Sequence, residues 1–222
     1  GPATYVFLDA GPCTPTGGFC PLPEWGKLLD KSVHPRRVDV SRIAIHGLEK
    51  SSMLYEPGVS VVVPAYNEVH SIAHTIAQIT AYFEKRQSTC EIIVAADGDD
   101  GTCELVADMA RTDPRLKVIG STVRRGKGYG IRQGVALARG KIIGFVDADN
   151  KTPIDEYDKV KPLLHADYDI VIGSRGLPDA VIERPQPWYR RLGSMGFGVF
   201  MHTVVGLRDI PDTQCGFKFF KN

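Results

Sequence analysis

The sequence predicts an α/β fold in which a doubly wound, mostly parallel sheet carries helices on both faces. From residue 59 onward, short runs rich in β-branched residues, such as VSVVV at 59–63, alternate with longer amphipathic stretches. This alternation is typical of strand–helix–strand units, whose right-handed crossovers make the strands parallel. The chain has 222 residues, of which 43% are hydrophobic, so it is long enough to bury one sizeable core.

The alternating strands and helices are expected in a regular order. The expected strands are residues 59–63, 91–96, 116–121, 141–146 and 169–174. The expected helices are residues 70–86, 102–112, 128–138 and 154–165. The first helix places apolar side chains on one face, at Ile72, Ile76, Ile79 and Phe83. In sheets of this kind, ligands bind beyond the carboxyl ends of the strands.

The first 57 residues differ from the rest, so we divide the chain into an N-terminal extension, 1–57, and a main domain, 58–222. Gly1 and Pro2 resemble the remnant of a cleaved expression tag. Residues 11–23 are rich in glycine and proline, which predicts irregular chain, and residues 36–48 alternate as one strand would. Cys13 and Cys20 could form a disulfide, with free thiols as the alternative.

Charge and hydropathy exclude several classes of function. The net charge of +1 and the pI of about 7.8 provide no global field for nucleic acid, so we expect no nucleic-acid partner. No run of 18 consecutive apolar residues occurs, so no segment of this sequence is expected to span a bilayer.

The stretch IIGFVDADNKTP, residues 142–153, places two carboxylates directly after a buried strand. Asp147 and Asp149 repel each other unless a hard divalent cation and a diphosphate share the site. The alternative is that they cap a helix that begins near Pro153. A similar pair, Asp167 and Asp169, precedes a strand and is expected to face solvent at the opposite edge of the sheet.

Two nucleotide-binding motifs are excluded. GSTVRRGKG resembles a P-loop, but five residues separate Gly120 from Gly126, and Gly128 stands where a Ser or Thr would hold magnesium. A dinucleotide fingerprint would follow the first strand, where PAYNE stands instead. The basic, glycine-rich residues 124–128 still offer cations and close backbone approach to phosphates.

Seven segments occur in order across residues 59–222: VSVVVPAYNE, IIVAADGDDGT, RRGKGYGIRQGVALARG, FVDAD, VIGSR, QPWYRR and DTQCGFKFF. Together they resemble the inverting glycosyltransferases of the family 2 type, which have the GT-A fold. Within that family the chain is most similar to the synthases of dolichyl-phosphate (polyprenyl-phosphate) glucose and mannose.

The resemblance implies a nucleotide-sugar site. Pro64, Tyr66 and Glu68 would line the base and ribose of the nucleotide. Asp97 would meet the base, and Lys127 would lie near the donor. In the family two adjacent aspartates usually stand at the position of Asp97, whereas here a single aspartate follows an alanine and the loop is one residue shorter.

The resemblance also implies a metal and an acceptor site. Asp147 and Asp149 would hold Mg²⁺ or Mn²⁺, with Asp149 as the direct ligand. Arg175 would act in catalysis and, with Arg190 or Arg191, would hold the acceptor phosphate, because forked guanidinium groups suit phosphate oxygens. Related mannose synthases often carry an amide ligand two residues after the second aspartate, where this chain has Lys151.

The implied reaction is metal-dependent transfer of mannose or glucose, from GDP-mannose or UDP-glucose, to a polyprenyl or dolichyl phosphate. A phosphate acceptor is mostly dianionic at neutral pH and needs no general base. One alternative is a sugar hydroxyl acceptor, which would need a carboxylate base such as Asp212. The other is a non-catalytic nucleotide-sugar-binding module.

A lipid acceptor implies a membrane surface as a partner. Residues 188–207 carry apolar side chains on more than one side of a predicted helix, so one side could meet the interface and the other the core. Burial against the sheet or against further helices is the alternative. We expect weak membrane binding by this chain, on the cytoplasmic side, with anchoring by segments that this chain lacks.

Overall fold

The computed structural model describes residues 4–8, 57–166, 168–174, 203, 212 and 214–222. The strands are β1 (Thr4–Leu8), β2 (Val59–Tyr66), β3 (Cys90–Asp97), β4 (Leu116–Ser121), β5 (Ile142–Phe145), β6 (Ile170–Ser174) and β7 (Lys218–Lys221). The helices are α1 (Ile72–Lys85), α2 (Thr102–Ala110), α3 (Lys127–Leu137) and α4 (Tyr157–His165), with a 3₁₀ turn, η3 (Ile154–Glu156), before α4. The strand predicted at 36–48 and the helix predicted within 188–207 lie outside the described residues, as do Cys13 and Cys20.

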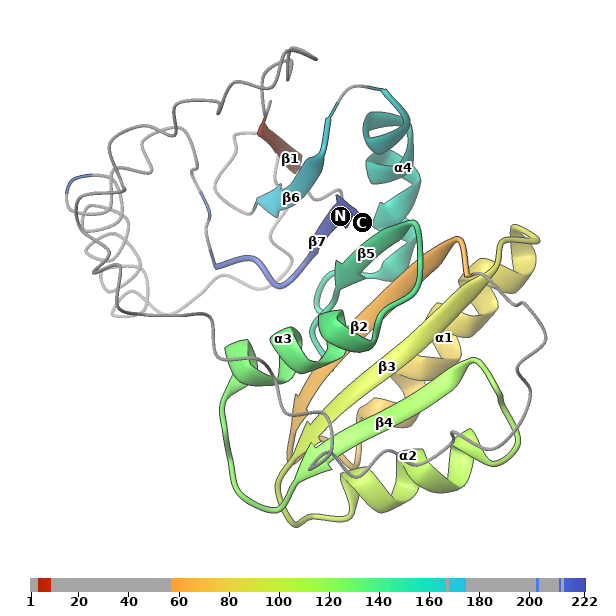
Figure 1. Ribbon diagram of the computed structural model, residues 1–222, viewed down its shortest axis with the longest axis vertical. Helices are drawn as coiled ribbons and strands as arrows, with labels where there is room; N and C mark the ends of the chain where they lie inside the picture. Colours follow the sequence, from red (N-terminus) through yellow and green to blue (C-terminus); the bar gives the residue numbers. More distant parts are fainter. Residues whose placement is uncertain (1–3, 9–56, 167, 175–202, 204–211, 213) are drawn as a thin grey trace.

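The described strands form one mixed sheet of seven strands, in the order β1-β6-β7-β5-β2-β3-β4 (Figure 1). The strands β5, β2, β3 and β4 lie side by side and run parallel to one another, as the sequence predicts. Two strands were not predicted. β7 lies between β5 and β6 and is antiparallel to both, and β1 pairs antiparallel with β6 at the edge.

Helices cover both faces of the parallel strands, as expected. On β3, Ile92 and Val94 belong to the core cluster that includes residues of α1, α2 and α4. Ile93 and Ala95 point to the opposite face, where Leu137 of α3 packs against them. This alternation follows from the two-residue period of a strand, and Figure 1 shows α3 alone on the near face among these helices.

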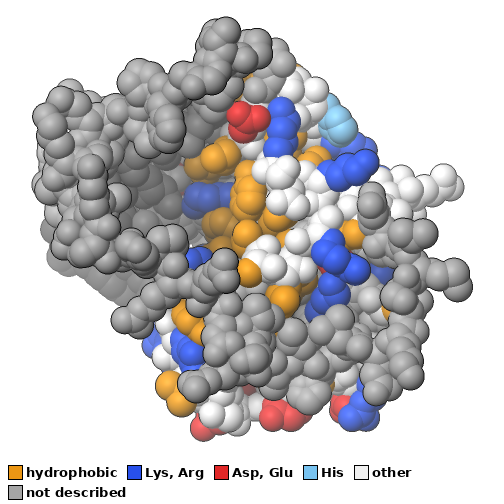
Figure 2. Space-filling model, in the orientation of Figure 1, with side chains coloured by type: hydrophobic (Ala, Val, Ile, Leu, Met, Phe, Trp, Pro, Cys, Tyr) orange, Lys and Arg blue, Asp and Glu red, His pale blue; other side chains and the backbone are white. Residues whose placement is uncertain are grey.

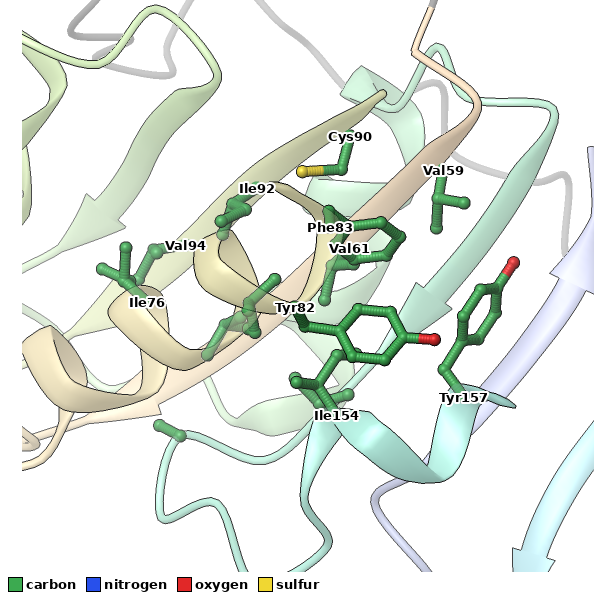
Figure 3. Close-up of a cluster of buried hydrophobic side chains, with 14 of the residues drawn as sticks. Val59, Val61, Ile76, Tyr82, Phe83, Cys90, Ile92, Val94, Ile154 and Tyr157 are labelled. Atoms are coloured by element: carbon green, nitrogen blue, oxygen red, sulfur yellow. The ribbon is translucent and has the colours of Figure 1, made fainter. Parts of the chain in front are cut away.

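Aromatic rings fill the core beneath α1. The predicted face of this helix is buried, since Ile72, Ile76, Ile79 and Phe83 are each 3% exposed or less. Figure 3 shows Phe83, Tyr82 and Tyr157 beside the valines of β2. The ring of Tyr157 lies 4.6 Å from that of Phe219 on β7, so the late strand joins the same core.

Helix α3 lies close to the sheet because glycine occupies its inner face. A Cβ on Gly134 would stand 2.4 Å from Cγ1 of Val62, and one on Gly130 would stand 3.1 Å from Cβ of Ala95. Such distances are shorter than carbon atoms tolerate, so larger residues would push the helix away. The close approach brings the N-terminal end of α3, at Lys127, to the carboxyl ends of β2 and β3.

A buried carboxylate fixes the other end of α3. Glu91 is 1% exposed and accepts hydrogen bonds from Lys117 Nζ (2.6 Å), Ser60 Oγ (2.6 Å) and the backbone N–H of Arg139 (2.6 Å). Burial alone would raise the pKa of Glu91, but these donors lower it below its usual range. The loop after α3 is thereby tied to β2, β3 and β4.

Proline in β2 is accommodated by the sheet geometry. β2 pairs with β5 only from Val59 to Val62, whereas its pairing with β3 continues to Tyr66. Pro64 lies beyond the end of β5, so its missing N–H breaks no bond on that side. The last residues of β2 therefore border an opening.

In the described part of the chain, no helix combines the length and the apolar character that crossing a bilayer requires.

Candidate functional site

A cavity of about 300 Å³ opens where β2, β3 and β5 end. Its lining residues are Pro64, Ala65, Tyr66, Glu68, Ala95, Asp97, Arg124, Gly126, Lys127, Gly130, Asp147, Ala148 and Asp149. Every site residue that the sequence predicts within the described ranges belongs to this set. Arg175, Arg190 and Arg191 lie outside the described residues, so their positions stay a prediction.

The backbone after β5 directs both aspartates into this cavity. Val146 continues the pairing with β2, since its N–H donates to the carbonyl of Val62 (3.0 Å). Ala148 is 3% exposed, and its carbonyl accepts a hydrogen bond from Thr75 Oγ1 of α1 (2.7 Å). With Val146 and Ala148 buried, Asp147 and Asp149 lie on the cavity side.

The capping alternative for these aspartates is wrong. The 3₁₀ turn that precedes α4 begins after Pro153, and no side chain caps it. Asp149 instead accepts a bond from the backbone N–H of Lys151 (3.3 Å), and Asn150 adopts a left-handed φ of 50° that closes the turn. The turn keeps both carboxylates at the cavity, where they are available to a ligand.

Each of the two carboxylates is paired with a lysine. Lys127 Nζ contacts Asp147, and Lys151 Nζ contacts Asp149. Lys151 is well exposed, with 82% of its side chain accessible, so another cation can readily replace its ammonium group beside Asp149. Within the described ranges, no group of three or more His, Cys, Asp or Glu side chains could hold a metal.

The segment before β7 packs directly against Asp147. A Cβ on Gly216 would stand 1.9 Å from Asp147 Oδ2, so only glycine leaves room for the carboxylate. Lys218 lies nearby, and its Nζ donates to the carbonyl of Cys215 (2.7 Å). Burial lowers the pKa of Lys218. Sequence reasoning assigned no role to Gly216 or Lys218, although both belong to the DTQCGFK segment of the family resemblance.

Asp97 lies at the centre of the carboxyl edge. In the sheet register it is opposite Tyr66 on β2 and Ser121 on β4. Its Oδ2 accepts hydrogen bonds from the backbone N–H groups of Arg125 (2.7 Å) and Gly126 (3.3 Å). Asp97 therefore contacts the loop that precedes α3, a contact that its predicted role at the base did not include.

An aromatic–cation pair stands at the mouth of the cavity. Tyr66 is 44% exposed, and the guanidinium of Arg124 lies 4.3 Å from its ring centroid. The sequence showed Arg124 only as one residue of a basic stretch. Figure 2 shows the face that carries α3, where Lys and Arg side chains are spread among the apolar ones and the few acidic side chains lie near the top and the bottom.

The loop after β2 is fixed to the loop after β3. The backbone N–H of Glu68 donates to Thr102 Oγ1 (3.0 Å), and that of Val69 donates to Asp100 Oδ2 (3.0 Å). Asp100 also accepts from the hydroxyl of Thr102 (2.6 Å). Although its partial burial opposes the charge, these hydrogen bonds lower the pKa of Asp100 below its usual range.

Two other aspartates, Asp169 and Asp212, make local contacts, whereas Asp167 lies outside the described residues. Asp169 precedes β6 at the opposite edge of the sheet, where its Oδ1 lies 3.5 Å from Lys221 Nζ. Asp212, the candidate base for a hydroxyl acceptor, accepts a hydrogen bond from the backbone N–H of Gln214 (2.9 Å).

The fold is that of known glycosyltransferases of the GT-A type. Mannosyl-3-phosphoglycerate synthase from Rubrobacter xylanophilus superposes with a TM-score of 0.52 at 19% identity, over 74% of this chain and 53% of that one. Glucosyl-3-phosphoglycerate synthase from Mycobacterium tuberculosis, solved with Mn²⁺, UDP and phosphoglyceric acid, gives a TM-score of 0.50 at 21% identity, over 74% and 56%. These likenesses confirm the predicted GT-A fold.

Sequence comparison identifies the glycosyltransferase family to which the chain belongs. The pattern of glycosyl transferase family 2 matches residues 60–221, so the chain belongs to this family. A dolichyl-phosphate beta-glucosyltransferase of Trichomonas vaginalis is 37% identical over 170 residues, which cover 72% of this chain and 50% of the relative. The human dolichyl-phosphate beta-glucosyltransferase is 32% identical over 176 residues, covering 73% and 54%. The chain spans about half the length of the curated relatives it matches.

Proposed function

We propose that the chain is the donor-binding domain of an inverting glycosyltransferase that transfers glucose from UDP-glucose to a dolichyl or other polyprenyl phosphate. The observation that carries the proposal is the cavity at the carboxyl edge, where Asp147 and Asp149 stand beside Lys127 and Arg124. A metal ion bound to a diphosphate carries positive charge on the metal and negative charge on the phosphates. Such a ligand suits a site where carboxylates and cationic side chains lie side by side. Glucose is favoured over mannose because the similar curated proteins are named beta-glucosyltransferases.

A divalent cation fits the residues present. Both carboxylates are already paired with ammonium groups, which indicates that this position favours positive charge. Mg²⁺ and Mn²⁺ are commonly held by one or two carboxylates, with water and substrate phosphates supplying the other ligands. Asp147 and Asp149 would hold the cation, which would neutralise the charge of the leaving diphosphate. Lys151 would remain a cation beside Asp149 and not a ligand, because its ammonium has no lone pair.

Each remaining group has a role in binding and orientation. Tyr66 offers an exposed ring for the base, and Glu68 borders the same end of the cavity. Lys127 and Arg124 would contact the diphosphate. Gly216 would keep the Asp147 carboxylate in place. A lipid phosphate acceptor is already anionic and needs no proton removed, so the site requires no carboxylate base.

The proposed lipid acceptor determines where in the cell the domain would work. A polyprenyl phosphate resides in a bilayer, so the domain would work at a membrane surface, on the cytoplasmic side. Arg175, with Arg190 or Arg191, would hold the acceptor phosphate. A hydroxyl acceptor is less well supported, since the candidate base Asp212 is engaged with the backbone of its own loop.

Calorimetric titration with UDP and GDP, with and without Mn²⁺, tests donor binding. We expect UDP to bind in a metal-dependent manner and Asp149→Ala to abolish that dependence. Asp169→Ala is the matched control, because it removes an aspartate of a similar pair at the opposite edge and should leave binding unchanged. Metal-independent binding that survives Asp149→Ala would overturn the assignment of the metal site.

Transfer is tested with labelled UDP-glucose or GDP-mannose and two acceptor classes. We expect label from UDP-glucose to enter a short-chain polyprenyl phosphate and not a panel of oligosaccharides. Label only in the oligosaccharides would exclude the lipid acceptor. Equal use of both donors would exclude the preference for glucose.

A further inference from the structure

We propose that Thr75 and Gln78 of α1 are positioning residues, which hold the chain on both sides of Asp149 and so orient its carboxylate for the metal. We call residues 147–150, which follow β5 and carry both aspartates of the site, the metal turn. The inference rests on the proposed function and deepens it. It gives a role in metal binding to a helix that contributes no residue to the lining of the cavity.

The hydroxyl of Thr75 contacts the metal turn inside the core. Thr75 is 1% exposed, and its Oγ1 donates a hydrogen bond of 2.7 Å to the carbonyl of Ala148, a residue that is 3% exposed. Water does not reach this carbonyl easily, and a buried carbonyl that lacks a donor is costly. The hydroxyl of Thr75 therefore decides where the carbonyl of Ala148 can point.

The bonded carbonyl belongs to the peptide unit directly before Asp149. Because a peptide unit is planar, a fixed oxygen also fixes the N–H of the same unit and restricts the φ rotation of the residue that follows. The side chain of Asp149 leaves the backbone at the next atom, so its direction depends on that rotation. Through the carbonyl of Ala148, Thr75 thereby controls the direction of the Asp149 carboxylate.

A second residue of α1 holds the other side of Asp149. The side-chain amide of Asn150 donates to Gln78 Oε1, and Gln78 Nε2 in turn lies 2.8 Å from His74 Nε2. Gln78 follows Thr75 by three positions, which places the two residues on the same side of the helix. The residues before and after Asp149 are therefore both bonded to α1.

The metal turn also has hydrogen bonds within itself, which act differently. The backbone N–H of Asn150 donates to the carbonyl of Asp147 (3.1 Å), and Asn150 has a φ of 50°. These local features set the shape of the turn. The bonds from α1 set how the turn is oriented relative to a helix whose apolar face is packed in the core.

The experiment measures the Mn²⁺ concentration that gives half of the full metal-dependent UDP binding, by calorimetry. Thr75→Val keeps the shape of the side chain and removes the hydroxyl, so the carbonyl of Ala148 must turn to reach another donor. We expect this Mn²⁺ concentration to rise about tenfold, equivalent to about 1.4 kcal/mol, and UDP binding without metal to change by less than about twofold. Thr75→Ser keeps the hydroxyl and should restore most of the Mn²⁺ affinity.

Two control variants change α1 away from the metal turn. Tyr82→Phe removes another hydroxyl from the buried face of the helix, where it donates to Asp158 Oδ1 of α4 (2.8 Å). Thr80→Val repeats the change of threonine to valine at a partly exposed position of the same helix. Both variants should keep the Mn²⁺ dependence of the unaltered protein, even where the free energy of unfolding falls.

A further pair of variants tests the bond on the other side of Asp149. Gln78→Ala removes the acceptor, and Asn150→Gly removes the donor while still permitting the left-handed φ. Each should raise the required Mn²⁺ concentration, and the two effects should be similar because the same hydrogen bond is lost.

The outcomes separate this inference from the proposed function. If Thr75→Val and Gln78→Ala lower stability but leave the Mn²⁺ dependence unchanged, both residues act on the fold alone and the positioning role is wrong. A Thr75→Ser protein as impaired as Thr75→Val would also refute it, since the hydroxyl would then not be the responsible group. If UDP binding to the unaltered protein is independent of metal, the proposed metal site fails, and the inference fails with it.

Discussion

Replacing Gly216 by alanine should displace one carboxylate of the site without unfolding the protein. The new Cβ would stand 1.9 Å from Asp147 Oδ2, and ordinary contact begins at 3.4 Å, so the oxygen must retreat by about 1.5 Å. The atom that must move is the end of a side chain that is 39% exposed, so the fold can absorb the change. Metal–oxygen distances of about 2.1 Å for Mg²⁺ leave no such tolerance.

We therefore expect Gly216→Ala to lower glucosyl transfer by about 100-fold, the usual effect of misplacing a reacting group by about 1 Å. Metal-dependent UDP binding, measured by calorimetry, should weaken in parallel, while the thermal unfolding midpoint should change little. Gly128→Ala, which adds the same methyl group in the first turn of α3, is the control, because nothing lies within 4 Å of its Cβ. Wild-type transfer and metal affinity in Gly216→Ala would refute this reasoning.

Further predictions concern stability, measured by urea unfolding. Glu91→Ala should lose about 3–5 kcal/mol, since it leaves the buried Lys117 without its carboxylate. Because the pKa of Glu91 is lowered in the fold, its contribution is complete above the ordinary value of 4.5 and is lost as the pH falls below it, so Glu91→Gln should flatten the acid limb of the stability profile. Tyr157→Phe should be neutral or slightly stabilising, because its buried hydroxyl has no hydrogen-bond partner among the described residues. Tyr82→Phe should lose about 1 kcal/mol, since it removes a bond of 2.8 Å to Asp158.

The parallel part of the fold could be predicted because its signals are local. The β-branched run at 59–63 and the apolar face of residues 70–86 each identify an element without knowledge of its neighbours. β7 offers no such signal. It is four residues long, KFFK, and gains its stability from pairing with two strands and from the rings around Phe219.

The candidate site likewise has parts that the sequence could predict and parts that it could not. The carboxylates of Asp147 and Asp149 could be placed at the cavity because they directly follow a strand whose direction is known. The hydrogen bonds between Asp97 and the loop that precedes α3 could not be predicted, because they depend on the backbone conformation that Gly126 adopts. The contact between Gly216 and Asp147 joins segments about 70 residues apart, and spacing alone does not bring them together.

The position of β7 links the completeness of the sheet to that of the site. Among the described strands, β6 and β1 connect to the parallel strands only through β7, which follows β6 in the chain by more than 40 residues. Without β7, the described sheet would consist of two separate pieces with open edges. Since Gly216 directly precedes this strand segment and lies against Asp147, a chain without β7 in place would also lack this wall of the site. A ligand that binds at this edge would therefore stabilise the chain with β7 in place over one without it.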